Sequence, residues 1–264
     1  MNYMESRIPV LIHTDMTRIS RDIFKSDNLY QHIFQLPYDH LKSVFVDFEL
    51  WFPAFNYDFA KSKLFKVDHD PVQVGSFNEW VRQTKNYSRS QVPIFSILRE
   101  VNKTATSTQS DFRPFSKAGE FGELVSRKGQ ILLFGARLNS LTFIHYVEEL
   151  LEIPYKYNKT FYGYIEFKSN TSPVSTTYLV RPMGLNLEYD WNKVHKILID
   201  NSIPQKISTL GNYELYDSKN LTDFMVDMYK KDIMWTLTEE SRVEVSKELD
   251  RLGRNFQNSD FEKI

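Results

Sequence analysis

The chain of 264 residues contains no cysteine and only 9 glycines. Without cysteine there is no disulfide, no thiolate metal site and no covalent cysteine nucleophile. The sequence also has no Gly-x-Gly-x-x-Gly turn, no Gly-Lys-Ser/Thr phosphate loop and no Gly-x-Ser-x-Gly elbow. Dinucleotide binding of the Rossmann type, P-loop phosphate binding and serine hydrolase chemistry are therefore disfavoured.

Long apolar runs and an excess of one charge are missing as well. No stretch of about 18 consecutive apolar residues occurs, and the N-terminal segment lacks the apolar run of a signal sequence. The 33 Lys and Arg nearly balance the 34 Asp and Glu, for a net charge of -1. Neither nucleic acid nor membrane insertion is therefore expected, and we predict a cytoplasmic protein.

Short apolar runs alternate with segments of helical spacing. The runs that predict buried strands are PVLIH (9–13), SVFVDFELWFPAF (43–55) and QILLFGA (130–136). A hairpin is predicted from FYGYIEF (161–167), the turn SNTSP and STTYLVRP (175–182). Helices are predicted at 76–82, 141–151, 221–231 and 239–252, and a long loop at 88–119. This alternation indicates an α/β protein. The chain is 41% hydrophobic, which is enough to form the core of one domain spanning 1–264.

His145 and Glu148 lie three positions apart on the helix predicted at 141–151. Their side chains share one face, so the carboxylate can fix the tautomer of the imidazole and raise the basicity of its other nitrogen. The helix follows a strand and Gly135, where an α/β sheet presents its ligand crevice. The spacing alone also fits a histidine that is merely satisfied in the core or at the surface, so the pair is a candidate base with its orienting partner.

The stretch around this pair, FSKAGEFGELVSRKGQILLFGARLNSLTFIHYVEELLEIPYKY (115–157), resembles the centre of the aminoglycoside 3-N-acetyltransferase family. A Gly- and Phe-containing segment, a strand that ends in Gly, and a Thr-x-x-His-x-x-Glu helix followed by Pro-Tyr occur there in the family's order. Further resemblances fall in sequence at VLIHTDM (10–16), FPAFNYDF (52–59), DPVQVGSFNEWVR (70–82), RSQVPIFSI (89–97) and LGNYELYDSKNLTDF (210–224). The resemblance covers most of the chain.

The resemblance implies a single α/β domain of the antibiotic N-acetyltransferase type, with a central mixed sheet flanked by helices. It implies acetyl-CoA as cosubstrate, His145 as general base and Glu148 as its partner. Ser96 is expected to contact the pantetheine arm, and the segment around Thr14 the phosphates, which suit a helix N-terminus. The complete set of expected CoA contacts is His13, Thr14, Asp15, Met16, Ser96 and Thr142.

Two departures from the family pattern concern the acceptor and the donor. Val92-Pro93 stands where the family usually has His-Pro, and Thr14-Asp15 stands where resistance enzymes carry paired serines before a Gly-Gly turn. These differences make the chain more similar to members that are associated with surface polysaccharides. The acceptor is then an amino sugar or a carrier-linked sugar, and the residues expected to contact it are Tyr57, Asp58, Glu188 and Asp190.

We therefore predict transfer of an acetyl group from acetyl-CoA to the amine of an amino sugar, by direct attack, in bacterial surface-polysaccharide biosynthesis. The alternatives are an aminoglycoside 3-N-acetyltransferase that confers resistance, a sugar O-acetyltransferase and a catalytically degenerate sugar-binding relative. A monomer or a homodimer is expected. Asp68, His69 and Asp70 are adjacent and precede Pro71, which favours a polar turn, so no metal is predicted.

Overall fold

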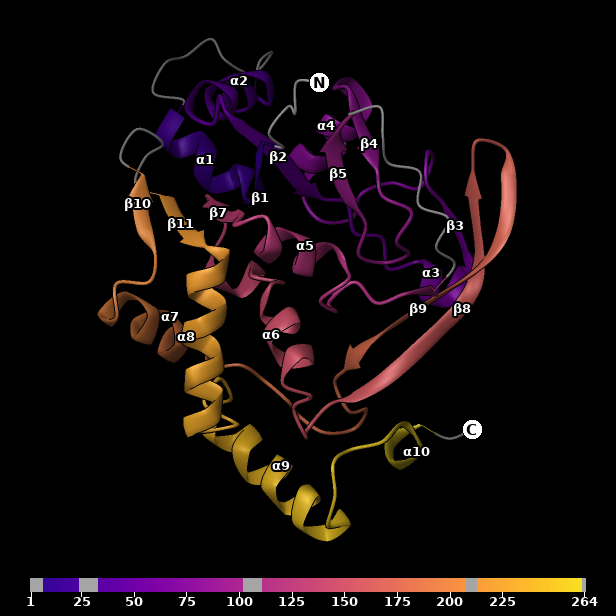
Figure 1. Ribbon diagram of the computed structural model, residues 1–264, viewed down its shortest axis with the longest axis vertical. Coiled ribbons are helices and arrows are strands. Elements are labelled where there is room, and N and C mark those ends of the chain that lie inside the picture. Colours follow the sequence, from indigo (N-terminus) through magenta and orange to yellow (C-terminus); the bar gives the residue numbers. More distant parts are fainter. Residues whose placement is uncertain (1–6, 24–32, 102–110, 208–212, 263–264) are drawn as a thin grey trace, which may run out of the picture.

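The computed structural model describes residues 7–23, 33–101, 111–207 and 213–262. Its centre is a seven-stranded mixed sheet in the order β10-β11-β7-β1-β2-β5-β4 (Figure 1). The three middle strands β7, β1 and β2 are parallel, and the outer strands are antiparallel to their neighbours. The strands are β1 (Ile8–Thr14), β2 (Phe48–Pro53), β4 (Tyr87–Arg89), β5 (Ile97–Glu100), β7 (Gln130–Phe134), β10 (Gln205–Ile207) and β11 (Tyr213–Asp217).

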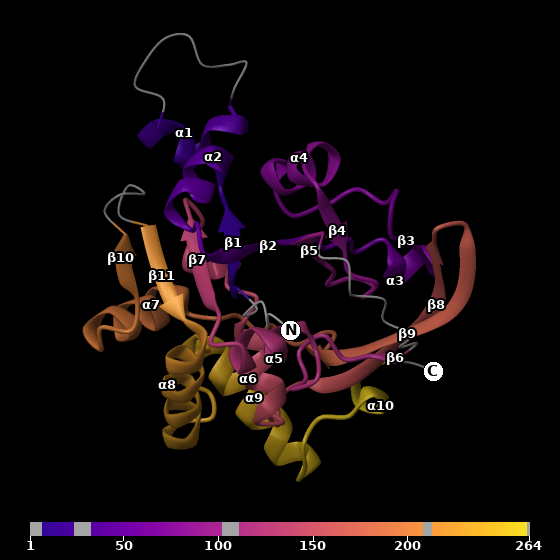
Figure 2. The ribbon, with the colours of Figure 1, turned by 45° about the horizontal axis from the view of Figure 1, so that its top comes forward.

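Both faces of the central sheet are buried, because successive residues of a strand point to opposite sides. Along β1, Leu11 joins one hydrophobic cluster while Val10 and Ile12 join the other. The second cluster is covered by helices α1 (Met16–Ile23), α2 (Gln35–Val44) and α4 (Ser76–Thr84). The first is covered by α5 (Glu120–Ser126), α6 (Ile144–Leu150), α7 (Trp191–Asp200), α8 (Ser218–Lys231) and α9 (Glu239–Leu252). Figure 2 shows α1, α2 and α4 in its upper half and α5, α6, α8 and α9 in its lower half.

A second sheet of four strands, β3-β8-β9-β6, lies beside the first. Its core is the long hairpin at the right of Figure 1. The strands are β3 (Leu64–Lys66), β6 (Asp111–Phe112), β8 (Tyr157–Phe167) and β9 (Asn170–Val180). The predicted hairpin is confirmed, but the prediction of a turn at SNTSP is wrong. The chain turns at Lys168 and Ser169, which adopt positive φ angles of 48° and 65°, as tight two-residue hairpin turns require.

The other sequence predictions differ from the structure mainly at the ends of elements. The strand predicted at 43–55 begins only at Phe48, because residues 43–44 complete α2. The helix predicted at 141–151 is α6, and the short 3₁₀ helix Leu138–Ser140 precedes it. The loop predicted at 88–119 contains β5 and β6, while its residues 102–110 lie outside the described residues. The two short helices α3 (Phe59–Ser62) and α10 (Asn258–Phe261) complete the described elements.

None of the helices in the described part of the chain is both long enough and apolar enough to cross a bilayer.

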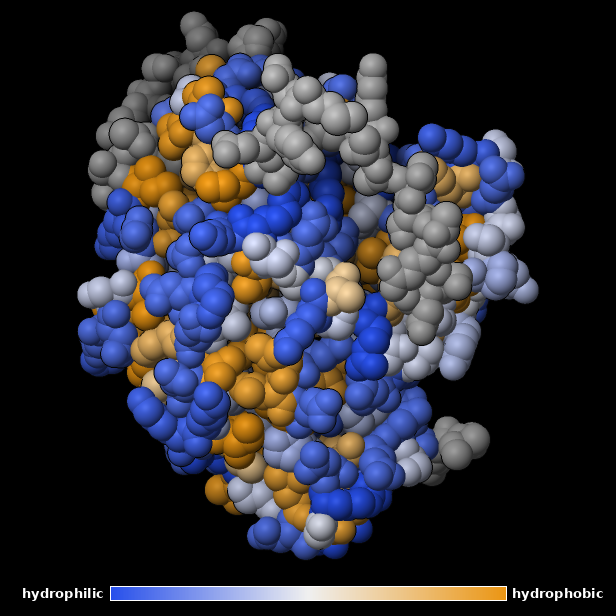
Figure 3. Space-filling model, in the orientation of Figure 1, coloured by the Kyte–Doolittle hydropathy of each residue, from blue (hydrophilic) through white to orange (hydrophobic). Residues whose placement is uncertain are grey.

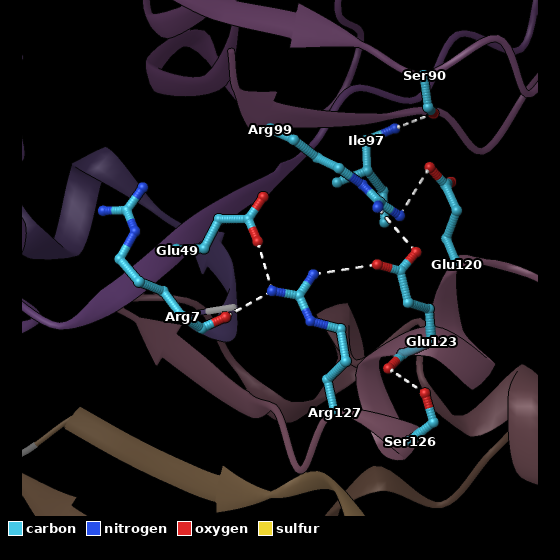
Figure 4. Close-up of polar contacts among 9 residues, drawn as sticks. All are labelled: Arg7, Glu49, Ser90, Ile97, Arg99, Glu120, Glu123, Ser126 and Arg127. Atoms are coloured by element: carbon cyan, nitrogen blue, oxygen red, sulfur yellow. Dashed lines mark hydrogen bonds and ion pairs between the residues drawn. The ribbon is translucent and has the colours of Figure 1, made fainter. Parts of the chain in front are cut away.

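A chain of alternating charges ties α5 to the strands above it (Figure 4). Arg99 reaches Glu123 at 2.8 Å and lies 3.5 Å from Glu120. Arg127 bonds Glu123 at 3.0 Å and Glu49 on β2 at 2.8 Å. Charge-assisted hydrogen bonds of this kind are shorter and stronger than bonds between neutral groups. The network therefore fixes α5, and with it the start of β7, against β2 and β5.

Glu120 is the poorly satisfied member of this network, and its replacement by Gln is expected to stabilise the protein at alkaline pH. Burial raises the pKa of Glu120 to about 7, although Arg99 opposes that rise, and no described residue bonds its Oε2. A raised carboxyl pKa means that the folded chain binds the proton more tightly, so the wild type gains stability as pH falls from 8 towards 5. Urea unfolding at pH 8 should show Glu120→Gln more stable by roughly 1–3 kcal/mol.

At pH 5 the two proteins should differ little, because Glu120 is then protonated in the folded state. Glu123→Gln is the matched control, since Glu123 accepts bonds from both Arg99 and Arg127 and its loss should destabilise the protein at both pH values. Equal destabilisation by Glu120→Gln at pH 5 and pH 8 would contradict the prediction.

Candidate active site

The glycine that ends β7 brings α6 to the edge of the central sheet. Gly135 has a φ of +72°, and a Cβ there would lie 2.6 Å from the carbonyl oxygen of Asp15 and 2.7 Å from Ile19. Only glycine tolerates both this backbone conformation and this close approach. The chain can therefore leave the sheet directly beside the start of α1, and α6 begins nine residues later with His145 in its first turn.

A cavity of about 550 Å³ opens where the three parallel strands end. His13 and Thr14 of β1 line it, together with Pro53 and Phe55 at the end of β2 and Asn139 after β7. The carboxyl ends of parallel strands are the usual ligand crevice of α/β folds. His145 also lines this cavity. The candidate base therefore lies where α/β folds usually bind their ligands.

The predicted pair is present as a hydrogen bond. His145 Nδ1 lies 2.9 Å from Glu148 Oε2, and the Glu148 side chain is completely buried while 28% of the His145 side chain is exposed. A carboxylate only accepts hydrogen bonds, so Nδ1 carries the hydrogen and Nε2 keeps a lone pair. Burial favours a raised pKa for Glu148, but Lys156 and His145 outweigh it and lower the pKa to about 2. Glu148 is thus a carboxylate at every working pH.

Four donors surround that buried carboxylate. Lys156 Nζ lies 2.6 Å from the same Oε2 that His145 bonds, and Tyr189 donates its hydroxyl to Oε1 at 2.6 Å. Tyr229 adds a longer bond to Oε1 at 3.3 Å. Lys156 also donates to the Tyr189 oxygen at 2.6 Å and lies 3.4 Å from His145 Nδ1. A buried charge needs such complete pairing.

The same surroundings keep His145 neutral. Burial lowers its pKa below the usual 6.5, and the nearby Lys156 ammonium lowers it further, whereas Glu148 acts in the opposite direction. Arg181 contributes a smaller lowering. The imidazole is therefore unprotonated near neutral pH and is available as a proton acceptor.

His13 and Thr14 give the other end of the cavity its polar groups. Burial lowers the pKa of His13 to about 4, and no described residue bonds its Nε2. The Thr14 hydroxyl donates to Asn78 Oδ1 at 3.1 Å, and Asn78 is held in turn by its bond to the Pro53 carbonyl at 2.9 Å. His13 is therefore a neutral polar group of the cavity lining, and its Nε2 has no partner among the described residues.

Two of the other predicted contacts also line the cavity, namely Thr142 and the half-exposed Tyr57. Three of the predicted CoA contacts do not. The Asp15 side chain accepts a hydrogen bond from the Thr17 backbone at 3.0 Å. Met16 packs against the second hydrophobic cluster, the one that includes Val10 and Ile12. Ser96 is completely buried and donates to the Ala54 carbonyl at 2.7 Å, so its hydroxyl is already used inside the protein.

The predicted acidic contacts to the acceptor also lie outside the cavity lining. Asp58 and Glu188 are exposed, and Asp190 caps α7 by accepting a bond from the Lys193 backbone at 2.9 Å. Within the described ranges, no group of three His, Cys, Asp or Glu side chains is arranged to hold a metal ion.

Sequence reasoning missed four residues of the site. Arg181, Tyr189 and Trp191 form one wall of the cavity, and Lys156 lies behind it. A lysine inside the apolar segment IPYKY was a usable signal, because a lysine that is buried needs a charged partner. The other three lie between β9 and α7 or at the start of α7, where no periodicity marks them.

A family model for aminoglycoside 3-N-acetyltransferase matches residues 48–230. The chain belongs to the aminoglycoside 3-N-acetyltransferase family. No curated protein matches this member of the family in sequence. The predicted family and the predicted enzyme class, a CoA-dependent N-acetyltransferase, are thereby confirmed.

Solved structures similar to this family member share its fold. The aminoglycoside acetyltransferase AAC(3)-Xa superposes with a TM-score of 0.65 at 18% identity, covering 84% of this chain and 86% of that chain. AAC-IIIb in a binary complex with CoASH gives 0.66 at 16% identity, covering 87% and 92%. The YokD protein from Bacillus subtilis gives 0.60 at 15% identity, covering 87% and 89%. The predicted α/β fold with a central mixed sheet flanked by helices is confirmed.

Proposed function

We propose that residues 1–264 form one acetyltransferase domain that moves the acetyl group of acetyl-CoA to the amine of an amino sugar, with His145 as general base. The observation that carries this proposal is the bond of 2.9 Å from His145 Nδ1 to the buried Glu148 carboxylate. This bond leaves the lone pair on Nε2 of a ring that lines the cavity. Glu148 orients the base and stabilises the imidazolium that forms.

In the proposed reaction, the acceptor nitrogen attacks the thioester carbonyl and forms the new C–N bond. His145 Nε2 takes the proton that the nitrogen loses, the C–S bond breaks, and the proton then passes from the imidazolium to the CoA thiolate. Acid–base assistance of this kind is worth about 10²–10⁴ in rate. The absence of cysteine from the sequence is consistent with direct transfer.

The donor is proposed to enter at the end of the cavity that His13, Thr14 and Thr142 line. Support comes from the unbonded Nε2 of His13 among the described residues and from the related AAC-IIIb, which was solved with CoASH. Asp15 and Met16 are not included, because Asp15 already accepts a bond from the Thr17 backbone in the first turn of α1.

For the acceptor, we propose an amino sugar of bacterial surface-polysaccharide biosynthesis, modified in the cytoplasm where acetyl-CoA is made. Support comes from Val92 in place of the family's histidine and from Thr14-Asp15 in place of its paired serines. The family name favours a second candidate, an aminoglycoside.

Incubation of the purified protein with acetyl-CoA and a panel of amino sugars, including aminoglycosides, is expected to release free CoA only when an amine is present. Because the chain has no cysteine, a thiol reagent reports CoA alone. The product should gain one acetyl group in an amide that resists hydroxylamine. A product that hydroxylamine cleaves would identify a sugar O-acetyltransferase, and a protein without affinity for acetyl-CoA in calorimetry would be a degenerate relative.

A further inference from the structure

The charges around the cavity indicate what kind of acceptor it can hold. The ionisable residues in its described lining are His13, Tyr57, His145, Arg181 and Tyr189. Burial lowers the pKa of both histidines and raises the pKa of both tyrosines, so these four are neutral near pH 7. Only the Arg181 guanidinium is charged among them. The described lining thus carries a positive charge.

No carboxylate of the described residues lines the cavity to balance that charge. Glu148 is the acidic group nearest to the base, but it is completely buried and is bonded by Lys156 and His145. A polycationic acceptor gains affinity and speed of association from an acidic cleft and loses both beside an unbalanced cation. This cavity does not offer a polycation the charges that it needs.

Arg181 is held at the cavity wall by stacking. Its guanidinium carbon lies 4.8 Å from the centroid of the Tyr189 ring, and no described carboxylate forms an ion pair with it. The Tyr189 hydroxyl is fixed by Glu148 at 2.6 Å, so the stacking surface is rigidly placed relative to His145. Trp191 lies against Tyr189 with ring centroids 5.0 Å apart and adds an apolar face to the same wall.

We propose that the acceptor is an amino sugar that carries a phosphate, and that Arg181 binds this phosphate while the sugar amine faces His145. This inference rests on the proposed function. A guanidinium binds phosphate oxygens in a bidentate manner, and its stacking on an aromatic ring leaves that edge free. Trp191 gives a sugar ring an apolar surface to lie on. An amino sugar linked to a nucleoside diphosphate has all the required groups.

The test compares three acceptors with the wild type and Arg181→Gln: a nucleoside-diphosphate-linked amino sugar with a free amine, the same amino sugar without phosphate, and a polycationic aminoglycoside. Loss of a charged hydrogen bond of about 1.5–3 kcal/mol lowers kcat/KM roughly 10- to 150-fold. Arg181→Gln should show this loss only with the phosphorylated acceptor, and KM for acetyl-CoA should stay within about threefold. Arg251→Gln, which removes an exposed arginine of α9, should change neither value.

Each other outcome is decisive. A rise in KM for acetyl-CoA with unchanged acceptor kinetics would show that Arg181 binds a phosphate of the donor, and the inference would be wrong. A wild-type preference for the aminoglycoside or for the unphosphorylated sugar would also overturn it, while leaving acetyl transfer to an amine intact. Failure to acetylate any amine would instead refute the proposed function itself.

Discussion

Replacement of His145 with asparagine is expected to lower kcat by about 10²–10⁴, with little change in the affinity for acetyl-CoA. The asparagine amide can still donate to Glu148, so the buried carboxylate keeps a partner where the imidazole Nδ1 stood. What disappears is the lone pair of Nε2, the proton acceptor of the proposed reaction. Steady-state kinetics would measure the loss, and calorimetry with acetyl-CoA would show that the donor site is intact.

Glu148→Gln provides the companion variant. It keeps the size of the side chain and removes the charge that stabilises the imidazolium, so its kcat should also fall, while the accompanying loss of the ion pair with Lys156 should lower stability. Activity of His145→Asn within a few-fold of the wild type would remove His145 from the mechanism.

Lys156→Gln is expected to shift the pH dependence of the reaction towards alkaline pH. Burial is the largest cause of the lowered pKa of His145, and the Lys156 ammonium is the next. In the wild type this ammonium lies 3.4 Å from His145 Nδ1. With Lys156 neutralised, Glu148 still raises the pKa of His145 and only Arg181 still opposes it among the charged neighbours. His145 then protonates at a higher pH, so the acid limb of the kcat/KM profile should rise from its wild-type position below pH 6.5.

The pH profile separates this role of Lys156 from a merely structural one. Breaking a buried ion pair costs roughly 3–5 kcal/mol, so Lys156→Gln should also unfold at lower urea concentration, and rates must be normalised to folded protein. Tyr229→Phe is the matched control, because it removes a donor to Glu148 at 3.3 Å without changing a charge. Its acid limb should stay where the wild type has it. An unmoved acid limb in Lys156→Gln would contradict the role given to the lysine.

The hydrogen bond between His145 and Glu148 could be predicted from sequence because its geometry is local. His145 and Glu148 are three residues apart on one helix, and helical spacing alone brings their side chains together. Lys156 and Tyr189 reach the same carboxylate from 8 and 41 positions away. Those contacts depend on how the chain leaves α6 and how the segment after β9 returns, and no short-range pattern encodes either path.

The acidic residues predicted to contact the acceptor lie outside the cavity lining, because one residue type serves several purposes. Asp190 lies immediately before α7 and its carboxylate caps that helix, a role that the sequence Asp-Trp-Asn-Lys before an apolar stretch could have indicated. The hairpin turn differs from the predicted one because Lys168 and Ser169 adopt positive φ angles that are normally taken by glycine or asparagine. Strands β1 and β7, by contrast, were predicted because their apolar residues face two buried layers.

The face of the molecule in Figure 3 carries hydrophobic patches among many hydrophilic residues. The wall formed by Arg181, Tyr189 and Trp191 has a consequence for how substrate preference changes among relatives. Tyr189 faces the cavity with its ring and bonds Glu148 and Lys156 with its hydroxyl. A lineage that adapts to a new acceptor can exchange Arg181 or Trp191 while the hydrogen bonds of His145 and Glu148 stay in place. A change at Tyr189 affects both the cavity wall and the hydrogen bonds of Glu148. Relatives with other substrate preferences should therefore differ at Arg181 or Trp191 and keep the tyrosine at position 189.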